Sequence, residues 1–234
     1  SATMAGSAFA MATQKVIAKA RMIAAHALKV PLDDVKFADG VFSSPKTNQT
    51  MTIQEVAADA AIPAKIPKDM EPGLIATAVY KAPVNNYPNG CHVCEVEIDM
   101  ETGETRIVRY SVVDDVGTML NPLLVHGQVQ GGIAQGIGQA LMEDIHFDAS
   151  GQLVTASFMD YAMPRAHNLC AMHVESNPVP TKTNPLGTKG VGEAGCVGAL
   201  PAVVNAVVNA LAEFGVKHIE MPATSERIWR AMQK

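Results

Sequence analysis

Glycines interrupt a helical pattern between residues 121 and 144, and this segment constrains the fold more than any other part of the chain. Asn121 and Pro122 provide an N-cap and a first-turn proline, and leucine and isoleucine then recur at helical spacing. The interrupting residues are Gly127, Gly131, Gly132, Gly136 and Gly138. Each glycine inside a helix costs about 1 kcal/mol relative to alanine. The segment therefore predicts a helix that approaches another backbone or a ligand closely.

Amide side chains favour the ligand over a second helix. Gln128, Gln135 and Gln139 are separated by seven and four residues. They therefore share one helix face with Gly131 and Gly132. The glycines alone fit tight helix packing equally well. A face of amides and glycines suits a polar, hydrogen-bonding ligand better, and we expect the ligand to explain the glycines.

The remaining pattern predicts an α+β fold with mixed sheets and packed helices. Residues 4–29 are expected to form a helix whose apolar stripe, including Phe9 and Ile23, faces a core. The proline-rich stretch 62–73 is read as a linker. It divides the chain into an N-terminal helix with a small α/β segment (1–73) and one continuous region of strands and helices (74–234). The other expected elements are a strand pair at 35–44, a short helix capped by Thr52 and Glu55, strands at 75–81, 92–99, 105–113 and 171–175, a hairpin at 146–155, a helix with Pro201 in its first turn, and a last helix from Thr224.

Charge and composition exclude several classes of protein. The chain has 18 Lys and Arg against 23 Asp and Glu, and its basic residues form no cluster, so we expect no nucleic-acid partner. It has no uninterrupted apolar run long enough to cross a membrane, and its first residues lack an export-signal pattern. Four cysteines in 234 residues do not make a disulfide scaffold. A cytoplasmic location is the default expectation.

Residues 190–195 read G-x-G-x-x-G, the dinucleotide-binding pattern, and open a helix. That pattern needs a strand directly before it, whereas residues 183–189 here are rich in threonine, proline and glycine. A nicotinamide dehydrogenase is therefore the weaker interpretation, and a loop of backbone N–H groups able to hold an anion remains. Within the loop, Glu193 is either a partly buried general base or a helix cap, and the pattern alone favours the cap.

The cysteines and histidines predict no metal centre. Cys91 and Cys94 form a C-x-x-C without a second pair, and a strand would point them to opposite faces. We interpret them as structural. The adjacent Asp114 and Asp115 are interpreted as turn residues at the end of a strand.

Several motifs together resemble one protein family. Asp115-Val116-Gly117 and Asn121-Pro122 lead into HGQVQGGIAQGIGQAL (126–141), and TNPLGTKGVGEAG (183–195) precedes an apolar helix. This order resembles the C-terminal part of the molybdenum-binding large subunit of the xanthine oxidase and aldehyde oxidase family. The nearest likeness is to carbon-monoxide-dehydrogenase-like large chains. The family's upstream cofactor loops have no counterpart, so the chain is expected to be a fragment of a larger subunit.

The resemblance implies a role for each matching residue. Glu193 matches the family's catalytic base. The metal is held through its pterin and not by a side chain of this chain. The residues that match cofactor contacts are Gln128, Gln135, Lys189, Gly190, Val191, Gly192 and Ser1.

The resemblance also implies cofactors and partners. The expected cofactor is molybdenum with molybdopterin cytosine dinucleotide, and iron–sulfur and FAD groups are expected on partner subunits of a dimeric complex. The expected activity is oxidation or hydroxylation of an electron-poor carbon, in an aldehyde, a nitrogen heterocycle or carbon monoxide, with water as the oxygen source. The isolated chain is expected to be inactive. The alternative is a non-catalytic fragment or assembly module without metal.

Overall fold

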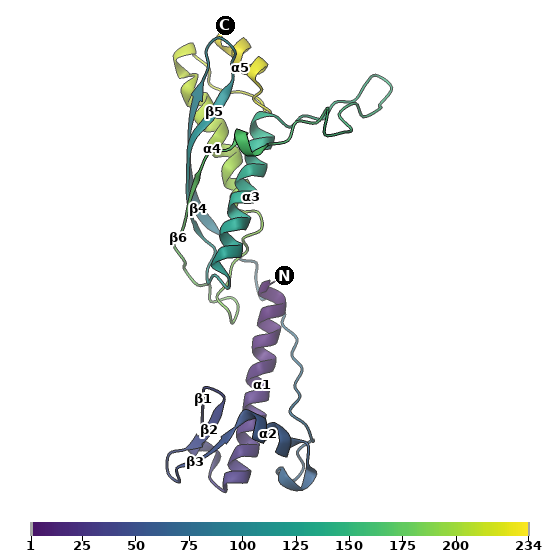
Figure 1. The fold of residues 1–234 in the computed structure, drawn as a ribbon, viewed down its shortest axis with the longest axis vertical. Helices are drawn as coiled ribbons and strands as arrows, with labels where there is room; N and C mark the ends of the chain where they lie inside the picture. The colour runs from purple at the N-terminus through teal and green to yellow at the C-terminus, as the bar shows by residue number, and fades with distance from the viewer. Residues whose placement is uncertain (1, 234) are drawn as a thin grey trace. The chain divides into compact units, whose positions relative to one another are not determined.

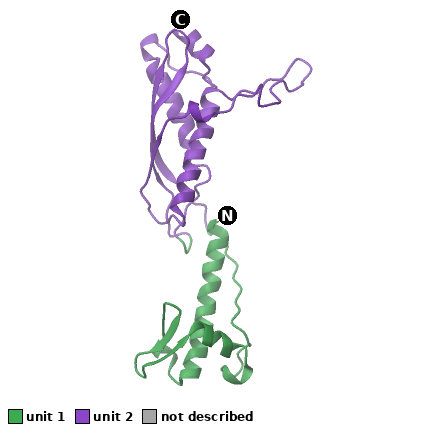
Figure 2. Cartoon of the chain, in the orientation of Figure 1, with its two compact units in different colours: residues 1–83, 184–186 green, residues 84–183, 187–234 purple. Residues whose placement is uncertain are grey.

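A computed structural model describes residues 2–233 and divides into two compact units (Figure 2). Unit 1 comprises residues 1–83 with 184–186, and unit 2 comprises residues 84–183 with 187–234. The predicted division after residue 73 assigns the cofactor-binding region to residues 74–234. This functional assignment stays a prediction.

Unit 1 is built on one long helix and a small sheet (Figure 1). Helix α1 (Ala2–Leu28) is followed by an antiparallel sheet in the order β1-β2-β3 and by helix α2 (Ile53–Ala60). The strands are β1 (Lys36–Ala38), β2 (Val41–Ser44) and β3 (Gln49–Thr52). Ile23 is fully buried in the core of this unit, but Phe9 is 74% exposed, so the predicted apolar stripe of α1 is wrong at that position. The spacing of apolar residues in the sequence does not show how far along α1 the core of unit 1 extends.

The predicted cap of α2 is confirmed. The Glu55 N–H donates to Thr52 Oγ1 at 3.2 Å, and the Thr52 N–H donates to Glu55 Oε2 at 2.7 Å. These two bonds satisfy donors that a helix start leaves unpaired.

A three-stranded sheet with β5 in the middle organises unit 2. Strand β4 (Asn89–Ile98) runs antiparallel to β5 (Thr105–Asp115), and β6 (Met172–Ser176) runs parallel to β5. Helices α3 (Pro122–Leu141) and α4 (Ala194–Ala210) pack against each other, and α4 also packs on β4. The chain ends with α5 (Ser225–Met232). Short 3₁₀ turns lie at Leu32–Asp34, Pro63–Lys65, Ala166–Asn168 and Ala212–Phe214.

Close packing of α3 on α4 explains part of the glycine pattern. A Cβ atom on Gly132 would lie 2.8 Å from the Cys196 backbone nitrogen, and one on Gly136 would lie 2.6 Å from the Ala199 Cβ. The expectation that a ligand explains all these glycines is therefore wrong for the buried ones. Gly127 and Gly131, however, face open space with no atom within 4 Å of an added Cβ.

Three predicted elements differ from the structure. Helix α4 begins at Ala194, so Pro201 lies inside the helix and not in its first turn. Residues 75–81 form no strand, because no neighbouring strand pairs with them. The hairpin at 146–155 is reduced to one isolated bridge between Phe147 and Leu153.

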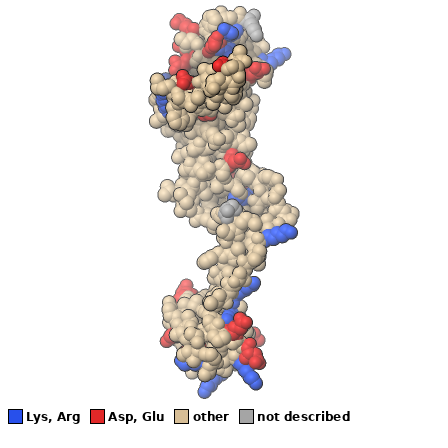
Figure 3. Space-filling view, turned by 90° about the vertical axis from the view of Figure 1, so that its right-hand side faces the viewer, with Lys and Arg blue, Asp and Glu red and all other residues tan. Residues whose placement is uncertain are grey.

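The surface of unit 2 is uneven in charge. On the face drawn in Figure 3, acidic and basic side chains mix at the end that carries α5, and fewer charges lie elsewhere on this unit. The segment between α3 and β6 extends away from the sheet (Figure 1). Among residues 2–233, no helix has both the length and the apolar character needed to cross a membrane.

Candidate cofactor-facing site

The loop before α4 is tied to the end of β5 by backbone bonds. The Thr118 N–H donates to Gly187 O and the Lys189 N–H donates to Val116 O, each at 2.9 Å. Gly117 has a φ of 66°, and a Cβ atom there would overlap the Gly187 carbonyl. A glycine is therefore required where the strand end and the loop cross.

An ion pair fixes the same crossing. The Lys189 ammonium is bonded to Asp115 Oδ2, and these side chains are only 11% and 14% exposed. The other carboxylate oxygen of Asp115 accepts the N–H groups of Gly117 and Val179, each at 2.9 Å. Burial alone would raise the pKa of Asp115, but the Lys189 ammonium and the two N–H groups outweigh it and hold that pKa at about 2. Asp115 thus accepts the N–H two residues on, as a turn residue does, and it is also a structural anchor, which the interpretation as a turn residue does not include.

One side chain connects the loop to α3. Gln128 Nε2 donates to the carbonyl oxygen of Gly192 at 2.7 Å. Gln135 and Gln139 are exposed along the same helix face. The contact brings this amide face beside the turn that carries Glu193.

Glu193 lies at the N-cap position of α4 but does not cap it. Its side chain makes no capping hydrogen bond, and the residue is exposed. Both sequence-based interpretations, a partly buried carboxylate and a cap, are therefore wrong for this chain on its own. The preceding loop leaves the Glu193 side chain uncovered at two positions, because Gly190 and Gly192 have no side chain and open space surrounds the place of an added Cβ.

The other predicted cofactor contacts differ in what they present. The Val191 side chain packs against the core of unit 2, so the backbone is what it offers to a ligand. Ser1 lies outside the described residues.

The residues present fit a large polar cofactor with an anionic part. Gly127, Gly131, Gly190 and Gly192 leave open space along α3 and ahead of α4. Exposed glutamine amides lie beside that space. The N-terminus of α4 follows this loop directly and carries the positive end of the helix dipole, which favours anions.

One cysteine lies beside this site: burial, aided by the nearby Glu193, raises the pKa of Cys196 in the first turn of α4. Cys91, Cys94, Cys170 and Cys196 are all free, and alternation along β4 leaves Cys91 exposed and Cys94 half-buried. Burial, aided by the nearby Cys170, raises the pKa of Cys94 to about 12, so its thiol stays protonated. Among the described residues, no group of three or more His, Cys, Asp and Glu could hold a metal ion.

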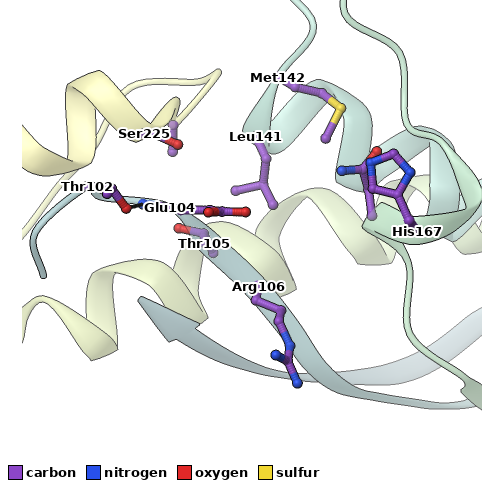
Figure 4. A pocket seen from close by; sticks show the side chains of 10 residues that line it. Thr102, Glu104, Thr105, Arg106, Leu141, Met142, His167 and Ser225 are labelled. Atoms are coloured by element: carbon purple, nitrogen blue, oxygen red, sulfur yellow. Dashed lines mark hydrogen bonds between the residues drawn. The ribbon is translucent and has the colours of Figure 1, made fainter. Parts of the chain in front are cut away.

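A pocket of unit 2 lies away from the turn that carries Glu193. Its volume is 410 Å³, and Glu104 just before β5, Met142 after α3 and His167 are among the residues around it (Figure 4). Leu141 also lines it and is 13 residues from Gln128, which is about 20 Å along a helix. This pocket is therefore separate from the Glu193 turn.

Comparison with known proteins identifies the family. Residues 1–170 match the molybdopterin cofactor-binding domain, which is more than half of the chain. The chain belongs to this family, which confirms the resemblance read from its motifs. The matched range includes Gln128 and Gln135, while residues 189–193 lie beyond it.

Relatives extend the match over the whole chain. The chain is 37% identical to the carbon monoxide dehydrogenase large chain of Hydrogenophaga pseudoflava, covering 100% of this chain and 29% of that protein. It is 38% identical to the 6-hydroxypseudooxynicotine dehydrogenase complex subunit gamma of Paenarthrobacter nicotinovorans, covering 100% of this chain and 29% of that protein. The chain therefore spans less than a third of the length of these relatives.

Solved structures confirm the predicted fold class. A Cu,Mo-CO dehydrogenase in its carbon monoxide reduced state matches 98% of this chain and 29% of its own, with a TM-score of 0.91 and 36% identity. Quinoline 2-oxidoreductase from Pseudomonas putida 86 matches 94% of this chain and 28% of its own, with a TM-score of 0.86 and 38% identity.

Proposed function

We propose that the chain is the C-terminal part of the molybdenum subunit of a molybdenum hydroxylase. Such an oxidoreductase oxidises or hydroxylates an electron-poor carbon and takes its oxygen from water. The observation that carries the proposal is the 2.7 Å bond from Gln128 to Gly192, because it joins the exposed amide face of α3 to the turn that carries Glu193. Membership of the molybdopterin cofactor-binding family supports it.

The proposed cofactor is molybdenum with molybdopterin cytosine dinucleotide. Gln128 and Gln135 would bind it from α3, and backbone groups of residues 190–192 would bind it from the loop. Lys189 contributes through its backbone and through the Asp115 ion pair that fixes the loop. Ser1 remains a predicted contact. The chemistry that the cofactor supplies when bound is two-electron oxidation of a substrate carbon with water as the oxygen source.

In this proposal Glu193 is the general base. Its carboxylate stands at the N-terminal end of α4, exposed and without a capping hydrogen bond, where a bound substrate can contact it. It accepts the proton released when oxygen from water is transferred to the substrate carbon, and then returns it to solvent. In the complete enzyme, substrate, cofactor and the rest of the subunit would cover this carboxylate.

Partners and substrate follow from the same proposal. Iron–sulfur and FAD subunits would carry the electrons away from a dimeric complex. The relatives are named for carbon monoxide, 6-hydroxypseudooxynicotine and quinoline. We therefore keep carbon monoxide, nitrogen heterocycles and aldehydes as the substrate class. A cytoplasmic location is supported by the four free cysteines.

Glu193→Gln in the complete enzyme tests the proposed base. Turnover should fall by at least about 100-fold, as expected for loss of a general base, while molybdenum content stays at the wild-type value. Glu213→Gln is the matched control, because Glu213 is also exposed and lies beyond the far end of α4. Wild-type turnover by Glu193→Gln would remove Glu193 as the base.

The 234-residue chain alone should show no turnover, because residues beyond it complete the cofactor site. Turnover by this chain would contradict the proposal. A complete subunit that contains no molybdenum would instead support the non-catalytic alternative.

A further inference from the structure

Unit 2 buries a polar triad that the proposed chemistry does not use. His92 of β4 lies between Tyr110 and Asp114 of β5. Its Nδ1 is 2.8 Å from the Tyr110 hydroxyl oxygen, and its Nε2 is 3.4 Å from Asp114 Oδ1. Tyr110 is fully buried, and the His92 and Asp114 side chains are 6% and 5% exposed. Such a group is costly to bury unless its hydrogen bonds are satisfied.

The contacts suit one arrangement of protons in the triad. Burial, reinforced by Cys94 and Asp114 nearby, raises the pKa of Tyr110, so its hydroxyl stays protonated. With the His92 proton on Nε2, that N–H faces the acceptor Asp114 Oδ1, and Nδ1 can accept from the Tyr110 hydroxyl. Asp114 Oδ2 is completely buried and has no hydrogen-bond partner among the described residues.

The chain leaves room for this triad on two sides. A Cβ atom on Gly90 would overlap the Asp114 carboxylate, and one on Gly198 would overlap the His92 ring. Gly90 pairs with Asp114 in the sheet, and Gly198 belongs to α4. Strand β4 and helix α4 thus each have a glycine where any side chain would collide with the triad.

A small pocket connects the triad to the start of α4. It has a volume of 110 Å³, and its walls include His92, Asp114, Ala194, Val197 and Gly198. A water molecule occupies about 30 Å³ in the liquid, so the pocket has room for a few. Ala194 directly follows Glu193 in the chain.

We propose that the buried His92 and Asp114 anchor the first turns of α4. His92 fills the gap left at Gly198 and is held there by its contacts with Tyr110 and Asp114. The anchor fixes the turn on which Glu193 stands. Its role in catalysis rests on the proposed function, and there His92 is a positioning residue and not a catalytic one.

Hydrogen exchange of the 234-residue chain tests the anchor without any activity. In His92→Phe, which keeps an aromatic ring but no polar atom, amides 194–198 should exchange at least about tenfold faster than in wild type, as loss of buried hydrogen bonds predicts. His92→Gln, which keeps an amide donor, should recover most of the protection. His173→Phe is the matched control, because His173 is an exposed histidine on β6 of the same sheet and should leave these amides unchanged.

Two results of the exchange experiment would refute the anchor. Wild-type exchange at 194–198 in His92→Phe would overturn it, and so would an equal acceleration in unit 1, which would indicate general destabilisation. If His92→Phe does not fold, Asp114→Asn replaces it, with the same local acceleration expected and unchanged exchange refuting the anchor.

The complete enzyme separates this inference from the proposed function. His92→Phe should lower kcat while KM and molybdenum content stay at wild-type values, and His92→Gln should recover most of the lost kcat. If Glu193→Gln is fully active but His92→Phe still loosens residues 194–198, the proposed function fails and the anchor stands.

Discussion

Adjacent glycines of α3 should respond to alanine with opposite signs. Gly132 faces the backbone of α4, where an added Cβ would lie 2.8 Å from the Cys196 nitrogen and 3.0 Å from the Gly195 Cα. Gly131, its neighbour, faces open space. Gly132→Ala should therefore destabilise unit 2, and Gly131→Ala should stabilise it.

The size of each effect follows from these contacts. Both substitutions gain about 1 kcal/mol of helix propensity. At Gly132 the obstructing atoms are backbone, so α3 and α4 must separate, and overpacking of this kind costs about 1–3 kcal/mol. The net result is a loss of up to about 2 kcal/mol for Gly132→Ala and a gain of up to about 1 kcal/mol for Gly131→Ala.

Thermal and urea unfolding of the 234-residue chain measure both variants. A change of 1 kcal/mol shifts the Tm by about 2–4 °C in a chain of this size, so the two variants should differ by several degrees. Equal stability of Gly132→Ala and Gly131→Ala would refute the close approach of α3 to α4. In that case a ligand, and not the packing of α3 on α4, would explain the buried glycines.

Two further predictions concern stability. The pKa of Asp115 is lowered to about 2, so its contribution is present above the unfolded-state value and is lost as the pH falls from about 4 to about 2. Asp115→Asn should remove about 2 kcal/mol at neutral pH and flatten the acid limb of the urea-midpoint profile, whereas an unchanged limb would exclude the Lys189 anchor. Thr52→Ala should cost unit 1 about 1 kcal/mol because it removes the α2 cap, measured as the urea midpoint, and an unaltered midpoint would contradict that cap.

Local signals were the predictable part of this fold. Thr52 with Glu55 and Asn121 with Pro122 mark helix starts through bonds within a few residues, and both starts are found as predicted. The start of α4 was missed by several residues. Its first turns are rich in glycine and alanine, and contact with α3 stabilises them more than their own propensity does.

Residues whose role depends on distant partners were not predictable. The sequence does not separate Gly131 from Gly132, because only the position of α4 decides which of them is covered. The sequence indicates only a turn residue at Asp115, because its partner Lys189 is 74 positions away. The one signal for both Asp115 and the buried Asp114 was an acidic pair at the end of an apolar strand.

The open face of α3 is the face proposed to meet the molybdenum cofactor. Gly131→Leu in the complete subunit tests this directly, because no other described residue lies within 4 Å of an added Cβ at that position apart from the helix's own nearby backbone, and the chain itself should fold unchanged. Gln130→Leu is the control, since Gln130 is exposed on α3 but about 100° round the helix from Gly131. Molybdenum per subunit should fall below about a tenth of the wild-type value in Gly131→Leu only, because the new side chain occupies the cofactor's space. Full molybdenum content in that variant would contradict the proposed role of this face.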